Sequence, residues 1–489
     1  MAKLSYWFQL GLVLAASSAA ASDIVSDRPY GTEKTYDLTT QQIHGGETYD
    51  FSGILSSVVF DGDDVWFGNP ITAFGFGSWV KGQRQGNKIL VESGQMIHHQ
   101  DAGDGCPELD VSVVSGSWLG DMPWPDGEEY AEFLVSGDGT IVLPEGKMLL
   151  ATDQYGSILA SNNGYYFRPI DLEAAVCAPP SGLQPEEYCL HYRQSFFGED
   201  MYRLVELVKD GDAFYVKGLC GTYAPDGWCV GRRDGDYVRF ASGQYQGVAK
   251  EAFLDYMYGG RVDPLGSLDG HEPERSLQFS YSSATGELAS SGVVLETIGD
   301  RILVDSYAEP ELKPYLPKEA VPAKPEMRGY TEYPDFTVVR FNIPPVDENG
   351  DYIDPKGIVW RLMLDGEPYV FDPEVFGHLS ERKEVFAWGE CDGEKGVDIV
   401  FESCGLYNIW LYENFNTVAV ECTFTHDGKS HTVISDAMEV GHAGIDSPDA
   451  SCPDGDGEAY TLDGIPADGS APGIVVEARK RLKVLNKKP

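Results

Sequence analysis

Five tryptophans are the residues of this chain whose chemistry points most directly to a ligand. Trp66, Trp79, Trp118, Trp124 and Trp228 stand in or beside short apolar runs that are typical of β-strands. An exposed indole ring can stack on the face of a sugar, so all five are candidate glycan-stacking residues. The alternative is that each indole closes the core of its own structural unit, because aromatic side chains dominate core burial.

A second group of residues has the oxygen chemistry of a calcium site. Asp347, Asn349, Asp351 and Asp354 follow one another at the spacing of part of a Ca²⁺-binding loop. The bidentate glutamate of such a loop is missing at the twelfth position, and Ca²⁺ takes six or more oxygens. A plain hairpin turn is therefore the other interpretation, and the acidic residues of 454–458 leave the same choice open. We expect no other cofactor.

Motifs of established catalytic chemistry are absent from the sequence. The chain has no Gly-x-Ser-x-Gly, no His-Glu-x-x-His and no glycine-rich phosphate loop. It has 78 acidic residues, so carboxylate pairs abound and no glycosidase pair can be singled out. We do not expect an enzyme. A secreted hydrolase remains the alternative, and it would need a cleft that holds two carboxylates in different environments.

An internal duplication predicts the secondary structure around several of the tryptophans. Residues 61–95 align without a gap on residues 210–244, and ten of the thirty-five positions are identical, where about two or three would match by chance. Short β-branched and aromatic runs flank tight turns such as Gly86-Asn87 and Asp234-Gly235 in the two copies. The sequence predicts two antiparallel β units, with a short helix over 251–258.

The N-terminus and the net charge bear on location and partners. Residues 1–21 contain Lys3, an apolar run and small residues at Ala19 and Ala21, which is the pattern of a secretory signal peptide. No other stretch is apolar for long enough to span a membrane as a helix. The formal net charge of −42 argues against nucleic-acid binding, which needs clustered positive charge. We expect an exported protein.

Nine cysteines in an exported chain suggest disulfides with one thiol left over. Spacing alone makes three pairs plausible: Cys177 with Cys189, Cys220 with Cys229, and Cys391 with Cys404. A zinc site is not expected, because the chain has no Cys-x-x-Cys and its histidines are scattered.

Composition divides the chain into an all-β series of segments. Prolines cluster between 309 and 325, which predicts an extended linker, and strand-like runs with hairpin turns follow. We expect a signal peptide (1–21), an N-terminal segment with the first β unit (22–170), the second β unit (171–312), a proline-rich linker (313–325), an immunoglobulin-like β-sandwich (326–442), an acidic linker (443–458) and a basic C-terminal segment (459–489).

Three groups of stretches together resemble a known family. Residues 59–65, 79–82 and 93–95 resemble a repeat in uncharacterised exported proteins of Bacteroidales, of the Bacteroides and Prevotella type. Residues 339–344, 397–401 and 423–436 look like the β-sandwich that follows those repeats. Residues 460–464 and 472–476, with the basic end, are similar to the short C-terminal sorting segment of that phylum. The resemblance implies type IX secretion and attachment to the surface of a Gram-negative bacterium, and it carries over no catalytic residue.

Together these features favour a non-enzymatic binding or scaffold protein at the cell surface or outside the cell. A glycan or a host or surface protein is the expected partner. An adhesin or pilus-like subunit is a further alternative, and it would need an unpaired apolar edge strand that accepts the strand of a partner.

Overall fold

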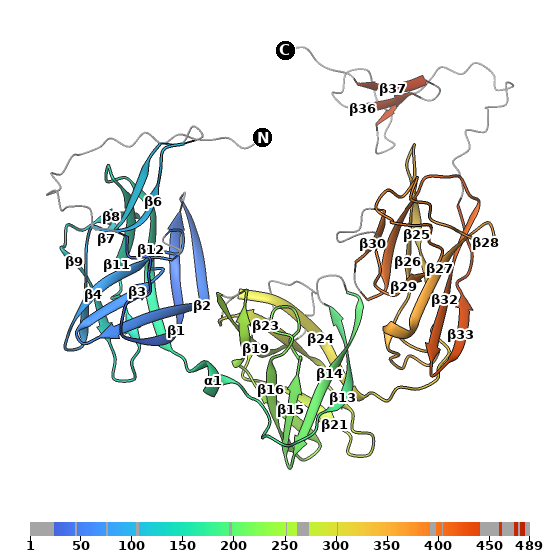
Figure 1. Ribbon diagram of the computed structural model, residues 1–489, viewed down its shortest axis with the longest axis horizontal. Coiled ribbons are helices and arrows are strands. Elements are labelled where there is room, and N and C mark those ends of the chain that lie inside the picture. The colour runs from blue at the N-terminus through green and yellow to red at the C-terminus, as the bar shows by residue number, and fades with distance from the viewer. Residues whose placement is uncertain are drawn as a thin grey trace.

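The computed structural model describes residues 24–484 apart from 45, 75–76, 104–106, 195–197, 251, 262–272, 301, 392–397, 403, 441–458, 462–473 and 478–479. The described part is nearly all antiparallel β-structure, with one short α-helix, α1 (Leu172–Ala175), so the all-β prediction is confirmed (Figure 1). The expected signal peptide (1–21) and acidic linker (443–458) lie outside the described residues.

The first β unit is a closed barrel with a side sheet. Eight strands pair in a ring, the last with the first: β1 (Thr32–His44), β2 (Glu47–Asp61), β3 (Asp64–Gly68), β4 (Trp79–Gln85), β5 (Lys88–Glu92), β9 (Tyr130–Val135), β10 (Ile141–Val142) and β12 (Ile158–Pro169). The side sheet continues from β12 through β11 (Lys147–Asp153) and β7 (Leu109–Leu119) to β6 (Gln95–Gln100) and β8 (Met122–Pro125).

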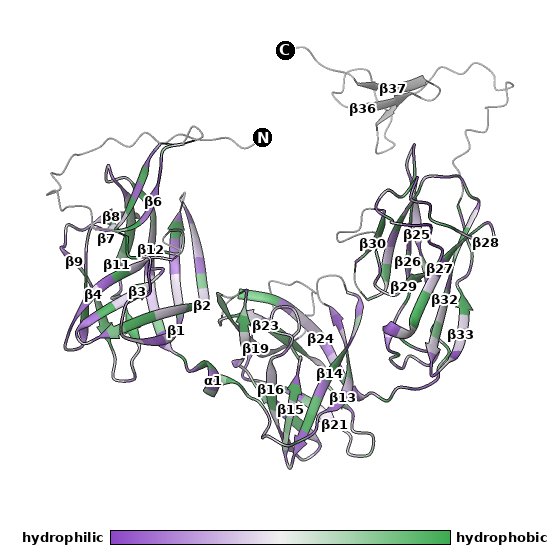
Figure 2. Ribbon diagram, viewed as in Figure 1, coloured by the Kyte–Doolittle hydropathy of each residue, from purple (hydrophilic) through white to green (hydrophobic). Residues whose placement is uncertain are grey.

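The second β unit repeats this topology strand for strand. Its ring consists of β13 (Glu186–Gln194), β14 (Asp200–Asp210), β15 (Ala213–Lys217), β16 (Trp228–Asp234), β17 (Tyr237–Ala241), β21 (Ser276–Tyr281), β22 (Leu288–Ala289) and β24 (Ile302–Pro314). Its side sheet runs through β23 (Gly292–Ile298), β19 (Phe253–Arg261), β18 (Gln244–Ala249) and β20 (Pro273–Glu274). Figure 2 shows hydrophobic and hydrophilic residues interleaved along the strands of both barrels.

Two of the identical pairs, the glutamines and the glycine at Gly82, bind backbone or fit where no Cβ can. The Gln95 side chain bonds both backbone polar groups of Lys81, at 2.7 and 2.8 Å, and Gln244 bonds those of Val230 at 2.7 and 3.1 Å. At Gly82, inside the first barrel, a Cβ would lie 2.6 Å from the Ile89 side chain. These identities are therefore accounted for by the fold itself.

The helix predicted over 251–258 is wrong, because residues 253–258 belong to strand β19. β19 lies between β18 and β23, and four consecutive residues from Leu254 to Met257 are buried. A strand that is covered on both faces shows no alternation of apolar and polar residues, so its pattern can be mistaken for that of a short helix.

The third domain is built from two antiparallel sheets around one core. One sheet holds β25 (Glu326–Glu332), β26 (Thr337–Asn342), β31 (Leu406–Leu411) and β30 (Ile399–Phe401). The other holds β28 (Glu367–Pro368), β27 (Ile358–Leu364), β32 (Thr417–His426) and β33 (Lys429–Ile434), with β29 (Phe386–Ala387) and β34 (Met438–Glu439) beside them. Phe341 of the first sheet meets Trp360 of the second at a ring distance of 5.3 Å. A three-stranded C-terminal sheet comprises β35 (Ala459–Thr461), β36 (Ile474–Glu477) and β37 (Lys480–Val484).

The three cysteine pairs that spacing alone made plausible are not disulfides in the part of the chain that the structure describes. Cys177, Cys189, Cys220, Cys229 and Cys404 are free thiols, so none of the three pairs is bonded. Spacing in sequence does not fix the direction of a side chain: the Cys229 thiol points at the Gln246 side-chain oxygen, 3.3 Å away, instead of at Cys220.

Candidate functional site

The two barrels meet where a bulge in β2 contacts the turn between β23 and β24. At Gly53 in the bulge, a Cβ would lie 2.3 Å from the backbone nitrogen of Gly299 in the turn. Both glycines have positive φ, at 66° and 59°, and such a close approach of two backbones requires residues without a Cβ. The Ser52 hydroxyl donates to the Asp300 carboxylate at 3.0 Å and accepts from its backbone N–H at 2.9 Å. The turn of the second barrel is thus fixed on the first.

An apolar contact supports this junction from one side. The Leu55 backbone N–H donates to the Ala252 carbonyl at 2.8 Å, which joins β2 to the strand end of β19. Leu254 and Tyr256 of β19 are buried in a small cluster with Leu55 and Leu172. The short helix α1 therefore helps to hold the two barrels in one arrangement.

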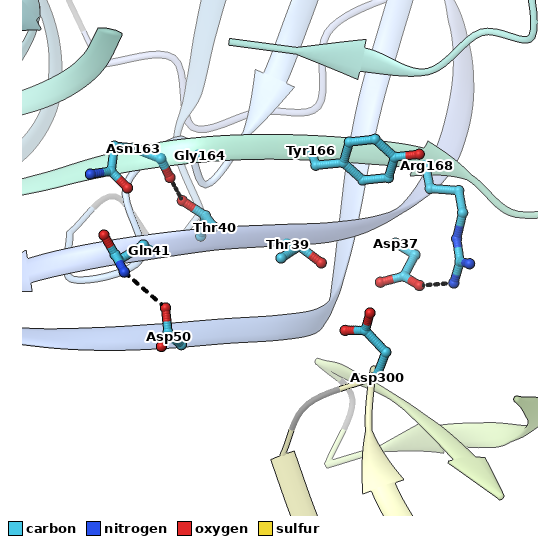
Figure 3. Close-up of a pocket in the computed structure, with 10 residues that line it drawn as sticks. All are labelled: Asp37, Thr39, Thr40, Gln41, Asp50, Asn163, Gly164, Tyr166, Arg168 and Asp300. Atoms are coloured by element: carbon cyan, nitrogen blue, oxygen red, sulfur yellow. Dashed lines mark hydrogen bonds and ion pairs between the residues drawn. The ribbon is translucent and has the colours of Figure 1, made fainter. Parts of the chain in front are cut away.

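Beside this junction lies a polar cleft of about 540 Å³. Its walls come from β1, β2 and β12 of the first barrel and from the β23–β24 turn of the second (Figure 3). β1 shifts register near Thr39 against both neighbours, and bulges of this kind re-aim side chains beside functional sites. None of the ten lining residues is aliphatic: Asp37, Thr39, Thr40, Gln41, Asp50, Asn163, Gly164, Tyr166, Arg168 and Asp300.

One end of the cleft is organised by a buried carboxylate. Asp37 is only 5% exposed, and the half-exposed guanidinium of Arg168 forms an ion pair with it. The Tyr256 hydroxyl of the second barrel donates to the same carboxylate at 3.1 Å. Burial, reinforced by the charge of Asp37, raises the pKa of Tyr256, so this hydroxyl keeps its proton and acts as the donor. Asp300 projects toward Asp37 from the second barrel (Figure 3).

The other end of the cleft is lined by amides and hydroxyls. The Gln41 amide donates to the Asp50 carboxylate at 3.0 Å, and the Thr40 hydroxyl donates to the Asn163 carbonyl at 2.8 Å. Between the two ends stands Tyr166, whose side chain is 46% exposed. The cleft thus combines planar hydrogen-bonding groups with an exposed aromatic ring, which suits a ligand rich in hydroxyl groups.

The five tryptophans predicted as stacking residues do not line the cleft. Trp118 and Trp124 are each 40% exposed on the hairpin of β7 and β8, but their cross-strand partners place them on opposite faces of that ribbon. Trp66, Trp79 and Trp228 are partly buried on outward faces of the barrels, where the Lys81 ammonium lies 5.4 Å from the Trp66 ring. The aromatic residue of the cleft is Tyr166, which the sequence analysis missed.

The calcium candidates form a turn whose carboxylates are already paired with a lysine ammonium. Asp347 accepts the backbone N–H groups of Asn349 and Asp351, both at 2.9 Å, as an Asx turn does. The Lys318 ammonium lies 2.9 Å from Asp347 and 2.7 Å from Asp351, while Asp354 caps a 3₁₀ turn, η2 (Pro355–Gly357). The carboxylates of this turn therefore already have partners within the chain. The acidic residues of 454–458 lie outside the described residues.

His99, Glu108 and Asp110 form a surface cluster that was not predicted. Their ligand atoms lie within 4.8 Å of one another, and this is the only such group among the described residues. Hydrogen bonds to Asp110 and then to Asp101 raise the pKa of His99. The two ring nitrogens of His99 already contact Asp110 at 2.7 Å and Asp101 at 3.1 Å, so the cluster is explained as a histidine held by carboxylates.

No helix in the described part of the chain is long and apolar enough to cross a membrane. Comparison of the chain with protein-family models, with curated proteins and with solved structures found no match. The site is therefore interpreted from its own geometry.

Proposed function

We propose that the protein is an exported, non-enzymatic binding protein that holds a carbohydrate in the cleft between its two barrels. The observation that carries this proposal is the lining of the cleft, in which an exposed tyrosine stands among amides, hydroxyls and charged groups without one aliphatic side chain. Pockets for apolar ligands have predominantly hydrophobic walls, so the cleft suits a polar ligand. The signal-peptide pattern of residues 1–21 supports an exported protein, which would meet glycans at the cell surface.

The proposal is tested with the chain from Ser22 on a glycan array, followed by calorimetry with any glycan retained. The variant Tyr166→Ala removes the exposed ring, and we expect it to weaken binding at least about tenfold, or ~1.4 kcal/mol. Tyr155→Ala is the matched control, because Tyr155 is an exposed tyrosine of the same barrel that does not line the cleft. Equal binding by the wild type and Tyr166→Ala would overturn the cleft proposal. Loss of binding in Trp118→Ala or Trp124→Ala instead would move the site to the hairpin.

A hydrolase is the second candidate, because the cleft brings together carboxylates from the two barrels. Asp37 and Asp300 face each other across it (Figure 3), as two carboxyl groups do in a glycosidase. Asp37, however, is bonded by a guanidinium and a hydroxyl donor. Release of reducing ends from a retained glycan, lost in Asp300→Asn, would favour this candidate over simple binding. Burial raises the pKa of the Cys189 thiol to about 12, which disfavours this residue as a nucleophile.

A further inference from the structure

A second group of carboxyl groups lies inside the second barrel, directly behind the cleft. Asp255 on β19 and Glu296 on β23 are fully buried, and Asp305 on β24 is 7% exposed. Carboxyl groups are seldom buried unless they have partners, because removing a charge from water is costly. The partners of these three groups therefore indicate what the cluster does.

Glu296 has a complete set of donors. The backbone N–H groups of Gly221, Thr222 and Tyr223 point at its carboxylate, at 3.0, 3.0 and 2.6 Å, and the Tyr307 hydroxyl donates to it as well. Four donors that converge on one carboxylate match its ionised form. Glu296 thereby fixes the loop between β15 and β16, which folds against this part of the barrel.

Asp255 differs from Glu296 because no such set of donors surrounds it. Both of its carboxylate oxygens are buried, and the groups that can hydrogen-bond to them are the adjacent Tyr256 N–H and the Glu296 carboxyl group. Burial, and then the neighbouring charge of Glu296, raises the pKa of Asp255 to about 8. Asp255 therefore carries a proton at neutral pH and donates it in a hydrogen bond to Glu296, so that the pair shares one proton.

The fold does not require these carboxyl groups. The strand registers show which positions of the two barrels correspond. Val113 of β7 pairs with Gln95 on one side and with Ala151 on the other. Met257 of β19 pairs in the same way with Gln244 and with Glu296, so Ala151 and Glu296 occupy equivalent positions. From the same registers, the counterparts of the three carboxyl residues in the first barrel are all buried and apolar: Val111 for Asp255, Ala151 for Glu296 and Ala160 for Asp305. The cluster is a property of the second barrel alone.

The strands that carry this pair also position the residues that the second barrel contributes to the cleft. Tyr256 follows Asp255 on β19 and reaches the opposite way, to Asp37 of the first barrel. At the end of β23, the Gly299 N–H donates to the Leu254 carbonyl at 2.9 Å, and Asp300 stands in the cleft wall. A change in the spacing of β19 and β23 would therefore move both contacts that the second barrel makes there.

We propose that the Asp255–Glu296 pair is a proton-operated switch of the cleft. With one shared proton, β19 and β23 stay together and hold Tyr256 and Asp300 against the first barrel. Loss of that proton places two like charges side by side in a buried site, which drives the strands apart and loosens the cleft. The regulatory role rests on the proposed binding function, whereas the switch itself does not.

The buried thiols and the Tyr307 hydroxyl beside the pair do not supply this titration. Burial raises the pKa of the Cys220 and Cys229 thiols and of the Tyr307 hydroxyl, so all three stay neutral when Asp255 ionises. Burial also raises the pKa of Asp305, whose carboxylate accepts the Thr222 hydroxyl at 3.0 Å. Burial also raises the pKa of Tyr245, and the Arg203 guanidinium lies 5.2 Å from the Tyr307 ring.

The direction of the effect follows from proton linkage. A carboxyl group whose pKa is raised on folding stabilises the folded state fully at pH values below its ordinary pKa. That contribution is lost progressively as the pH rises toward and through the raised value, here about 8. The cleft should therefore be well formed in acid and at neutral pH and should loosen in mildly alkaline solution.

Hydrogen exchange measured by mass spectrometry on the chain from Ser22, without ligand, tests the switch. After correction for intrinsic rates, we expect β19 and β23 to exchange at least about tenfold faster near pH 9.5 than near pH 6, and Asp255→Asn to remove this difference. Asp226→Asn is the control, because the Asp226 side chain is 89% exposed. The same pH effect in Asp255→Asn, or none in the wild type, would overturn the proposal.

A second variant guards against misfolding of the first. Asp255→Val installs the residue that the first barrel has at this position, and it should likewise remove the pH effect. Retention of the effect in Asp255→Val would contradict the switch. Because the exchange measurement needs no glycan, it stands even if the array finds no ligand. If a glycan is found, its affinity should fall near pH 9.5 in the wild type and not in Asp255→Asn.

Discussion

The first and second barrels hold the same loop in place with different chemistry. In each barrel, the loop between the third and fourth ring strands folds against the core and is held by side chains of neighbouring strands, from β12 in the first barrel and from β23 and β24 in the second. In the first barrel the bonds are neutral: the Asn162 amide donates to the Thr72 hydroxyl at 3.0 Å, and the Tyr165 hydroxyl donates to the Pro70 carbonyl. In the second barrel the corresponding loop is held by the carboxylate of Glu296.

This contrast separates what the duplicated fold needs from what one copy added. The pairs Gln95/Gln244 and Ser93/Ser242 make the same bonds to backbone in both barrels, and they have stayed identical. The positions of the buried carboxyl groups do not build the fold, and there the two copies differ completely. Glu296 holds a loop of its own barrel, and we infer that Asp255 beside it serves the contact with the first barrel.

The largest expected effect comes from removing the carboxylate that holds the loop. Glu296→Ala would leave three backbone N–H groups and the Tyr307 hydroxyl without an acceptor, and we expect a loss of about 3–5 kcal/mol in the free energy of unfolding. Urea unfolding followed by circular dichroism measures it, with the exposed Asp226→Ala as control. A loss below about 1 kcal/mol would mean that the loop is held by something else.

The two shared glutamines should have equal effects on stability, and each effect should be smaller than that of Glu296→Ala. Gln95→Ala and Gln244→Ala each remove bonds to both backbone groups of a neighbouring strand residue, and each should cost about 1–3 kcal/mol. The same urea experiment, run on the two variants side by side, tests whether the barrels are equivalent at their shared positions. A difference of more than about 1 kcal/mol between them would break the comparison.

The smallest effect is expected from the neutral loop of the first barrel. Thr72→Val removes the acceptor of the Asn162 amide at nearly constant volume and should cost about 1 kcal/mol, equally at pH 6 and pH 9. Thermal unfolding at the two pH values measures this, and Thr72→Ser, which keeps the hydroxyl, is the matched control. A cost that changed with pH would contradict the assignment of pH sensitivity to the second barrel.

Local patterns in the sequence were sufficient to predict the duplicated β units but not the cleft. Tight turns at Gly86 and Gly235, both with positive φ, and matched identities on either side of them indicated two antiparallel units of one kind. The cleft depends on a bulge in β2 that meets a turn almost 250 residues away, and no local pattern records such a contact. The polar run Thr39-Thr40-Gln41 was the one available signal.

The buried carboxyl groups were missed for a different reason. Asp255 and Glu296 are two of 78 acidic residues, and composition does not distinguish a buried carboxyl group from a solvated one. Aligning the two copies beyond residue 244 would have placed these residues opposite Val111 and Ala151, but the register drifts there and the strand was predicted as a helix. Only the pairing of β19 with β23 brings the two side chains together.

The measurement that tests the central contrast most directly is infrared difference spectroscopy of the carboxyl groups as a function of pH. We expect the wild type to show a protonated-acid carbonyl band at neutral pH that disappears with a midpoint near 8, the value to which the pKa of Asp255 is raised. The band should be absent from Asp255→Asn. A wild type without this band at neutral pH, or a band that persists unchanged in Asp255→Asn, would contradict the proton-bearing pair and with it the difference between the two barrels.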